Sequence, residues 1–147
     1  MKEIERKFLV DPEKWSKIKK PQAIHIVQGY LHRSDQLVTR IRIKDNKAFM
    51  AVKSSNIGIT RLEFEYEIPL IDAQEMLEQF CPKKIEKHRF EIPFGDYIWE
   101  VDEFISPNNG LILAEIELPD EKSIFQSPNW LSLEVSENPN YFNSNML

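Results

Sequence analysis

Charged and apolar residues alternate with a period of two along most of this chain. Successive side chains of a β-strand point to opposite faces, so each alternating segment has an ionic face and an apolar face. The pattern predicts eight strands, over residues 2–10, 23–32, 36–44, 47–54, 60–69, 83–92, 96–104 and 111–119. It also predicts two helices, over residues 12–20 and 72–80, which begin at the capping residues Asp11 and Asp72. The segment after Asp120 is compatible with a short helix, and the tail after Trp130 with one more short strand.

Eight antiparallel strands with few helices favour a closed sheet, because closure removes the unpaired edges. We therefore predict a mainly β (α+β) fold, an eight-stranded antiparallel barrel with a few helices packed outside. The length of 147 residues suits one domain over residues 1–147. Two closures remain open at this point. The charges line the lumen in one of them, and in the other they face solvent around an apolar core.

The charges on the ionic face are segregated by sign. Residues 1–53 hold 13 Lys and Arg and 6 Asp and Glu, whereas residues 54–147 hold 6 and 18, within a net charge of −5. Cations are concentrated on the strands predicted at 36–44 and 47–54, and carboxylates on those at 60–69 and 111–119. If these charges face inward, the lumen must hold water, ion pairs, metal ions and an anionic ligand, because unpaired charges out of water cost many kcal/mol.

Like charges also occur in pairs two residues apart, which places them on one face of a strand, about 7 Å from each other. Three such pairs are Glu3 and Glu5, Glu115 and Glu117, and Arg40 and Arg42. The carboxylate pairs offer the all-oxygen ligands that suit Mg²⁺ or Mn²⁺. The arginine pair offers two planar forks for phosphate oxygens. A linear polyphosphate chain that also binds metal fits such a lining.

Composition argues against several other classes of protein. A pI near 5.3 argues against a nucleic-acid binder that works by bulk charge. The longest apolar runs, such as 111–114, are too short to span a bilayer, and the alternation at residues 2–7 is not that of a signal peptide. The single Cys81 allows no internal disulfide framework and is interpreted as a packing residue. We therefore expect a cytoplasmic protein with no membrane or nucleic-acid partner.

Several motifs follow one another in the order found in one family. The segment 3–7, Glu-Ile-Glu-Arg-Lys, has the E-x-E-x-K signature of the CYTH superfamily, the triphosphate tunnel metalloenzymes. Further blocks are Q-G-Y-L at 28–31, R-I-R at 40–42, Lys53, R-L-E-F-E-Y-E-I-P at 61–69, K-H-R-F at 87–90, W-E-V-D-E-F at 99–104 and A-E-I-E-L at 114–118. Over nearly its whole length the chain resembles the short bacterial branch of this superfamily. The resemblance implies a tunnel with its ionic side inward, which binds a triphosphate and a divalent metal.

The resemblance also implies roles for individual side chains. The implied metal-binding candidates are Glu3, Glu5, Asp102, Glu115 and Glu117. The implied phosphate-binding candidates are Lys7, Arg40, Arg42, Lys53, Arg61, Lys87 and Arg89. Tyr30 and Lys53 occupy the positions of a Tyr–Lys dyad that takes part in proton transfer, and Glu5 is a candidate to activate water. Glu63 and Glu65 are expected to orient the basic residues or a metal-bound water.

The function that the resemblance implies is Mg²⁺- or Mn²⁺-dependent hydrolysis of a small anionic triphosphate, with inorganic tripolyphosphate as the first candidate. An adenylate cyclase or a thiamine or nucleoside triphosphatase on the same site is an alternative, as is a non-catalytic polyphosphate- or nucleotide-binding module. The oligomeric state is open, with a homodimer among the alternatives. The sequence departs from the family pattern at Ser54-Ser55, where a Gly is expected, and at Asn140, where an Arg is common. Both departures bear on substrate preference at the tunnel mouth.

Overall fold

The computed structural model describes residues 1–147 and contains nine strands, two α-helices and two short 3₁₀ helices. The strands are β1 (Lys2–Val10), β2 (Ile24–Arg33), β3 (Leu37–Lys44), β4 (Lys47–Ser54), β5 (Thr60–Ile68), β6 (Ile85–Phe94), β7 (Tyr97–Ser106), β8 (Ile112–Glu117) and β9 (Leu131–Glu134). The helices are α1 (Pro12–Ser16), α2 (Leu70–Phe80), η1 (Pro139–Tyr141) and η2 (Asn143–Asn145). The eight predicted strands are all present, and a ninth short strand follows Trp130.

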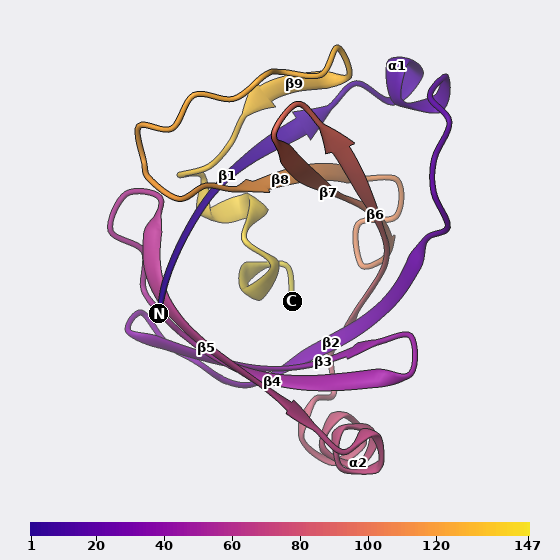
Figure 1. Ribbon diagram of the computed structural model, residues 1–147. Helices are drawn as coiled ribbons and strands as arrows, with labels where there is room; N and C mark the ends of the chain where they lie inside the picture. Colours follow the sequence, from indigo (N-terminus) through magenta and orange to yellow (C-terminus); the bar gives the residue numbers. More distant parts are fainter.

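The first eight strands close into an antiparallel barrel, which confirms the predicted fold (Figure 1). The sheet runs in the order β5-β4-β3-β2-β6-β7-β8-β1, and a pairing between β1 and β5 joins its two ends. The first half of β1 makes this closing pair, with Glu3 opposite Arg61. The second half of β1 pairs with β9, where Val10 lies opposite Leu131. Strand β9 therefore extends the sheet where β5 and β1 separate.

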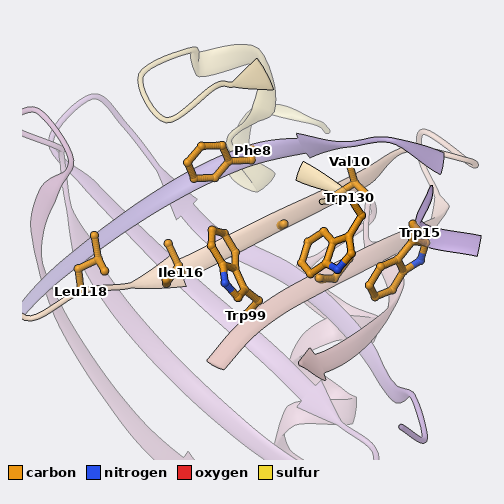
Figure 2. Close-up of a cluster of buried hydrophobic side chains, with 9 residues drawn as sticks. Phe8, Val10, Trp15, Trp99, Ile116, Leu118 and Trp130 are labelled. Carbon is orange, nitrogen blue, oxygen red and sulfur yellow. The ribbon is translucent and has the colours of Figure 1, made fainter. Parts of the chain in front are cut away.

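The largest hydrophobic core lies on the outer face of the barrel and not in its lumen (Figure 2). Its nine buried residues are Phe8, Val10, Trp15, Trp99, Val101, Ala114, Ile116, Leu118 and Trp130. Three tryptophans meet edge to face, with the ring of Trp130 5.2 Å from that of Trp15 and 5.9 Å from that of Trp99. Each such pair contributes about 0.5–1.5 kcal/mol beyond the burial of its area. The apolar face of strands β1, β7 and β8 is thus covered from outside.

A second core lies beneath α2, which packs on the outer faces of β2, β3 and β4. Gly29 of β2 permits this close approach, because a Cβ atom there would lie 2.7 Å from the Cβ of Cys81. Cys81 itself is buried beside Leu77 and Ile41. Its position agrees with the interpretation of a packing residue.

The helices differ from the prediction in three respects. Helix α1 ends at Ser16, four residues before the expected end, although Asp11 caps it as predicted by accepting a hydrogen bond from the amide of Lys14. Helix α2 begins at Leu70, so Asp72 lies in its first turn, where a carboxylate favours the helix dipole, and does not cap it. No helix forms directly after Asp120, whose carboxylate instead accepts a hydrogen bond from the amide of Lys122 in an irregular segment. Neither helix has the length and apolar character needed to cross a bilayer.

Candidate active site

The inward-facing side chains of the barrel surround an ionic cavity of about 200 Å³. Only four of its 22 lining residues are hydrophobic, so the closure with the charges inside is the correct one. All eight barrel strands contribute to the lining: Glu3, Glu5 and Lys7 from β1, Tyr30 from β2, Arg40, Arg42 and Lys44 from β3, Lys53 from β4, Arg61, Glu63 and Glu65 from β5, Arg89 from β6, Glu100 from β7, and Glu115 and Glu117 from β8.

One part of the lining consists of closely paired opposite charges. Glu3 lies 3.0 Å from the Nε of Arg61 and 3.4 Å from the Nζ of Lys53, and Lys53 also lies 2.8 Å from Glu63. Burial raises the pKa of Glu3, but the charges of Lys53 and Arg61 outweigh it and lower the pKa to about 2. Burial and the neighbouring arginines lower the pKa of Lys53 to about 8. Glu63 and Glu65, which were expected to orient basic residues, thus contact Lys53 and, at 3.1 Å, Arg40.

A second part of the lining brings the carboxyl groups of Glu5 and Glu115 into contact with each other. The half-buried Glu5 makes no ion pair with a basic side chain, and its pKa is raised well above the usual range by burial and by the charge and hydrogen bond of Glu115. Partial burial and the charges of Glu3, Glu63 and Glu100 also raise the pKa of Glu117, whose side chain is largely exposed. Burial also raises the pKa of Glu115, but Lys7, the hydrogen bond of Glu5 and Arg89 outweigh it and hold the pKa well below its usual range. The opposite shifts of Glu5 and Glu115 indicate that the pair shares one proton when no metal ion is bound.

These carboxylates fit a hard divalent cation, although they do not form a complete cage of ligands. No group of three or more His, Cys, Asp or Glu side chains is close enough to hold a metal ion by itself. Mg²⁺ is usually bound through one or two carboxylates, several waters and the phosphates of its substrate. The contact between Glu5 and Glu115 brings two carboxyl groups together, and such an ion would bind there in place of the proton that they share. Glu3 and Glu117 are the next nearest acidic residues along β1 and β8.

The opposite side of the cavity is formed by arginines. Arg42 donates to the neutral oxygen of Gln28 at 2.8 Å and has no carboxylate partner. Burial and the charges of Arg40 and Arg89 lower the pKa of Arg42 to about 10. The Nε of Arg40 is buried and has no hydrogen-bond partner, so an anionic oxygen would satisfy it. Positive charge therefore accumulates here, opposite the acidic residues, as a bound polyanion requires.

Two predicted site residues lie behind this lining. Lys87 and Asp102 are 0% and 1% exposed, and neither lines the cavity. Their side chains form an ion pair at 2.7 Å, and Asp102 also accepts two hydrogen bonds from Arg89, at 2.8 and 2.9 Å. Of the predicted phosphate-binding residues, Lys7, Arg40, Arg42, Lys53, Arg61 and Arg89 do line the cavity, with Lys7 3.8 Å from Glu115.

The two members of the expected Tyr–Lys dyad both line the cavity, but they do not contact each other. The hydroxyl of Tyr30 accepts a hydrogen bond from the Nε2 of Gln28 at 3.1 Å. The ammonium of Lys53 is occupied by Glu3 and Glu63 on the other side. The structure thus links Tyr30 to Gln28 and Arg42, and links Lys53 to the acidic residues.

The sequence analysis missed the contribution of the C-terminal segment, residues 136–147, which lies inside the outline of the barrel (Figure 1). Ser136, Phe142, Asn143 and Ser144 line the cavity. The backbone carbonyl of Tyr141 accepts from Lys7 at 3.0 Å, and the Oδ1 of Asn143 accepts from Lys87 at 2.8 Å. The available signal was the apolar character of Tyr141, Met146 and Leu147, which pack against a third buried core formed by Ile85, Phe104, Leu113 and Val135. Gln28, fully buried between Arg42 and Tyr30, was missed because an uncharged residue carries no electrostatic pattern.

The fold and this lining define a class of protein, an antiparallel β-barrel with an ionic bore in which acidic and basic residues face each other. The model of the CYTH domain family matches residues 1–144, and the chain belongs to this family.

Named relatives agree with this assignment. The chain is 44% identical over 147 residues to an inorganic triphosphatase of Acetivibrio thermocellus, covering 99% of this chain and 93% of the relative. It is 32% identical over 148 residues to an inorganic triphosphatase of Nitrosomonas europaea, covering 97% and 95%. A solved structure of an inorganic triphosphatase superimposes with a TM-score of 0.67 at 29% identity, covering 97% of this chain and 95% of that one.

Proposed function

We propose that this protein is a divalent-metal-dependent triphosphatase that hydrolyses inorganic tripolyphosphate. The observation that carries the proposal is the juxtaposition, in one cavity, of two contacting carboxyl groups, Glu5 and Glu115, and an arginine cluster with an unsatisfied buried donor. A metal–triphosphate complex is complementary to both halves at once, since the metal is attracted to the carboxylates and the phosphates to the arginines. The names of the two relatives, both inorganic triphosphatases, support the same reaction.

The basic residues are proposed to bind and orient the phosphate chain. Arg40 and Arg42 contact the phosphates with planar guanidinium groups, and Arg89 is held next to them by Asp102. Lys7, Lys53 and Arg61 add charge on the other side of the cavity, close to the carboxylates. Positive charge fixed around the substrate neutralises the charge that develops on the leaving and equatorial oxygens, and it requires no rearrangement during the reaction.

The carboxylates are proposed to hold Mg²⁺ or Mn²⁺, with Glu5 and Glu115 as the first ligands and Glu3 and Glu117 as additional ones. A divalent ion supplies neutralisation of phosphate charge and a lowered pKa of bound water when it is present. In the reaction, the oxygen of water bonds to the terminal phosphorus while the bond to the bridging oxygen breaks, which gives orthophosphate and pyrophosphate. Glu5 is the candidate acceptor of the water proton, because it lines the cavity and has no cationic partner. Tyr30 and Lys53 are candidate carriers of the proton to the leaving group.

An inorganic substrate is favoured over a nucleotide by the apolar content of the cavity. Its four hydrophobic lining residues are Tyr30, Val38, Ile59 and Phe142, which come from four separate segments. A base-binding pocket is usually a mostly apolar cleft with a few polar groups, whereas this cavity is mostly ionic. The cyclase and nucleotide-hydrolase alternatives therefore have less support than tripolyphosphate hydrolysis.

The test is phosphate release from tripolyphosphate, ATP and thiamine triphosphate, each with Mg²⁺, with Mn²⁺ and with EDTA. We expect release from tripolyphosphate with metal and none with EDTA. Release in EDTA would contradict the metal dependence. Cyclic AMP formation from ATP without phosphate release would favour the cyclase, and tight tripolyphosphate binding without turnover under either metal would favour a non-catalytic binding module.

A further inference from the structure

Asp102 has no oxygen available for a ligand in the cavity. Its Oδ1 accepts from the Nε of Arg89 at 2.8 Å, and its Oδ2 lies 2.9 Å from the Nη2 of Arg89 and 2.7 Å from the Nζ of Lys87. The side chain is 1% exposed and does not line the cavity. Its two cationic neighbours thus occupy the positions that a metal ion would need.

Lys87 is similarly engaged. Its ammonium contacts Asp102 and the Oδ1 of Asn143, and it lies 5.3 Å from the centre of the Phe104 ring. No part of the side chain is exposed, and it does not line the cavity either. Lys87 could therefore contact a phosphate in the cavity only after moving out of this buried position.

Arg89 connects this buried pair to the cavity. Its Nη1 lies 3.0 Å from Glu100 and its Nη2 4.0 Å from Glu115, and both of those carboxylates line the cavity together with Arg89. The β6–β7 register places Arg89 directly opposite Asp102, so the bidentate contact is built into the ladder. One negative charge between two cations leaves one positive charge in the group, and only Arg89 presents it to the cavity.

From this geometry we propose that Asp102 and Lys87 are positioning residues, which fix the guanidinium of Arg89 for phosphate binding and do not themselves bind metal or phosphate. The identity of the bound phosphate rests on the proposed function. The physical reason is preorganisation. An arginine that is already held in one orientation loses little side-chain freedom when an anion binds, so its affinity for the anion is higher. Lys87 in turn fixes Asp102, and Asn143 of the C-terminal segment fixes Lys87.

The charges of Arg89 and Lys87 keep Asp102 ionised. Burial raises the pKa of Asp102, but the charges of Arg89 and Lys87 outweigh it and lower the pKa to about 2. The carboxylate therefore stays ionised at any pH at which the protein would be assayed.

The experiment compares Asp102→Asn, Glu115→Gln and the matched control Asp96→Asn, which removes an exposed aspartate from the β6–β7 turn of the same hairpin. Mn²⁺ binding is measured by electron paramagnetic resonance without substrate. Tripolyphosphate binding is measured by calorimetry in EDTA, and KM and kcat are measured with Mg²⁺. Neither binding measurement needs turnover, so an inactive wild-type protein would overturn the proposed function and leave this proposal testable.

We expect Asp102→Asn to bind Mn²⁺ within about twofold of wild type and tripolyphosphate about tenfold to a hundredfold more weakly, with KM raised more than kcat is lowered. Glu115→Gln loses Mn²⁺ binding, and Asp96→Asn matches wild type in every measurement. Loss of Mn²⁺ binding in Asp102→Asn to the extent seen in Glu115→Gln would show that Asp102 is a metal ligand. Unchanged tripolyphosphate affinity would show that it does not position Arg89.

Asp102→Asn leaves Lys87 and Arg89 buried without their common counter-ion, which can prevent folding. The double variant Asp102→Asn/Lys87→Gln removes one charge of each sign and leaves only Arg89, still paired with Glu100. We expect the double variant to fold, to bind Mn²⁺ like wild type and to bind tripolyphosphate at least tenfold more weakly. Wild-type tripolyphosphate affinity, or loss of Mn²⁺ binding, in this variant would overturn the proposal.

Discussion

Two groups of carboxylates in this barrel differ in their partners, and the difference indicates that one group stabilises the fold and the other binds metal. Asp102 lies between Lys87 and Arg89, and Glu3 lies between Lys53 and Arg61, so each has two cations. Glu5 contacts another carboxylate and has no cation. The charges of the first kind are already satisfied and stabilise the fold. The raised pKa of Glu5 favours a bound proton in the empty barrel, and a metal ion would bind in place of that proton.

The largest expected effect separates these two groups by activity. Glu115→Gln removes a buried carboxylate that forms ion pairs with Lys7 at 3.8 Å and Arg89 at 4.0 Å. Burial raises the pKa of Glu115, but Lys7, the hydrogen bond of Glu5 and Arg89 outweigh it and hold the pKa well below its usual range, so we expect some loss of stability as well. The substitution also removes one of the two carboxylates proposed to hold the metal. We expect kcat/KM for tripolyphosphate to fall about 10²–10³-fold in the protein that remains folded. Phosphate release and thermal unfolding are the measurements.

The distinction between structural and metal-binding carboxylates would be wrong if Glu115→Gln unfolded at a markedly lower temperature while the folded fraction kept its activity. Glu115 would then belong with Asp102 among the structural ion pairs. Trp99→Ala serves as the control for a purely structural change. It removes a fully buried ring from the outer core and is expected to destabilise the fold by about 3–5 kcal/mol without altering the cavity.

The next effect concerns acid stability. The pKa values of Glu3 and Asp102 are both lowered to about 2, from ordinary values of 4.5 and 3.8. A carboxyl with a lowered folded-state pKa stabilises the protein above its unfolded pKa, and this contribution is lost as the pH falls through the folded value. We expect these two groups to account for about 2–4 kcal/mol of unfolding free energy lost between pH 5 and pH 2. Urea unfolding across this range measures the loss.

Glu3→Gln tests the contribution of Glu3 to the loss of stability between pH 5 and pH 2. It is less stable than wild type at pH 7, because Lys53 and Arg61 lose their counter-ion. It also loses less stability than wild type on acidification, since one of the two groups no longer titrates. Equal pH slopes for the two proteins would mean that the ion pairs of Glu3 contribute nothing to acid stability.

The sequence was sufficient to predict the barrel and the side of the sheet on which each charge lies, because both follow from the period of two. It could not predict which charges are partners. Asp102 and Glu115 both alternate with apolar residues, yet Asp102 is opposite Arg89 in the ladder, whereas Glu115 is opposite Glu100 on one neighbouring strand and Lys7 on the other. This difference depends on the register between strands, which a strand's own sequence does not encode. The tail has no periodicity, so the contacts of Asn143 and Tyr141 with lysines of β6 and β1 could not be foreseen either.

The smallest effect is a gain in stability at the site itself. Because the pKa of Glu5 is raised, the folded protein holds a proton there that the unfolded chain releases above about pH 4.5. The stabilisation by this proton is complete below the unfolded pKa and is lost as the pH rises through the folded pKa. Glu5→Gln cannot ionise, so we expect it to be more stable than metal-free wild type at pH 8, with no such gain at pH 4. Addition of Mg²⁺ should remove most of the difference at pH 8, because the ion neutralises the same charge in wild type and has lost a ligand in the variant.

If Glu5→Gln were instead destabilised at pH 8 in EDTA, Glu5 would be a satisfied structural carboxylate like Glu3, and the distinction between the two groups would not hold.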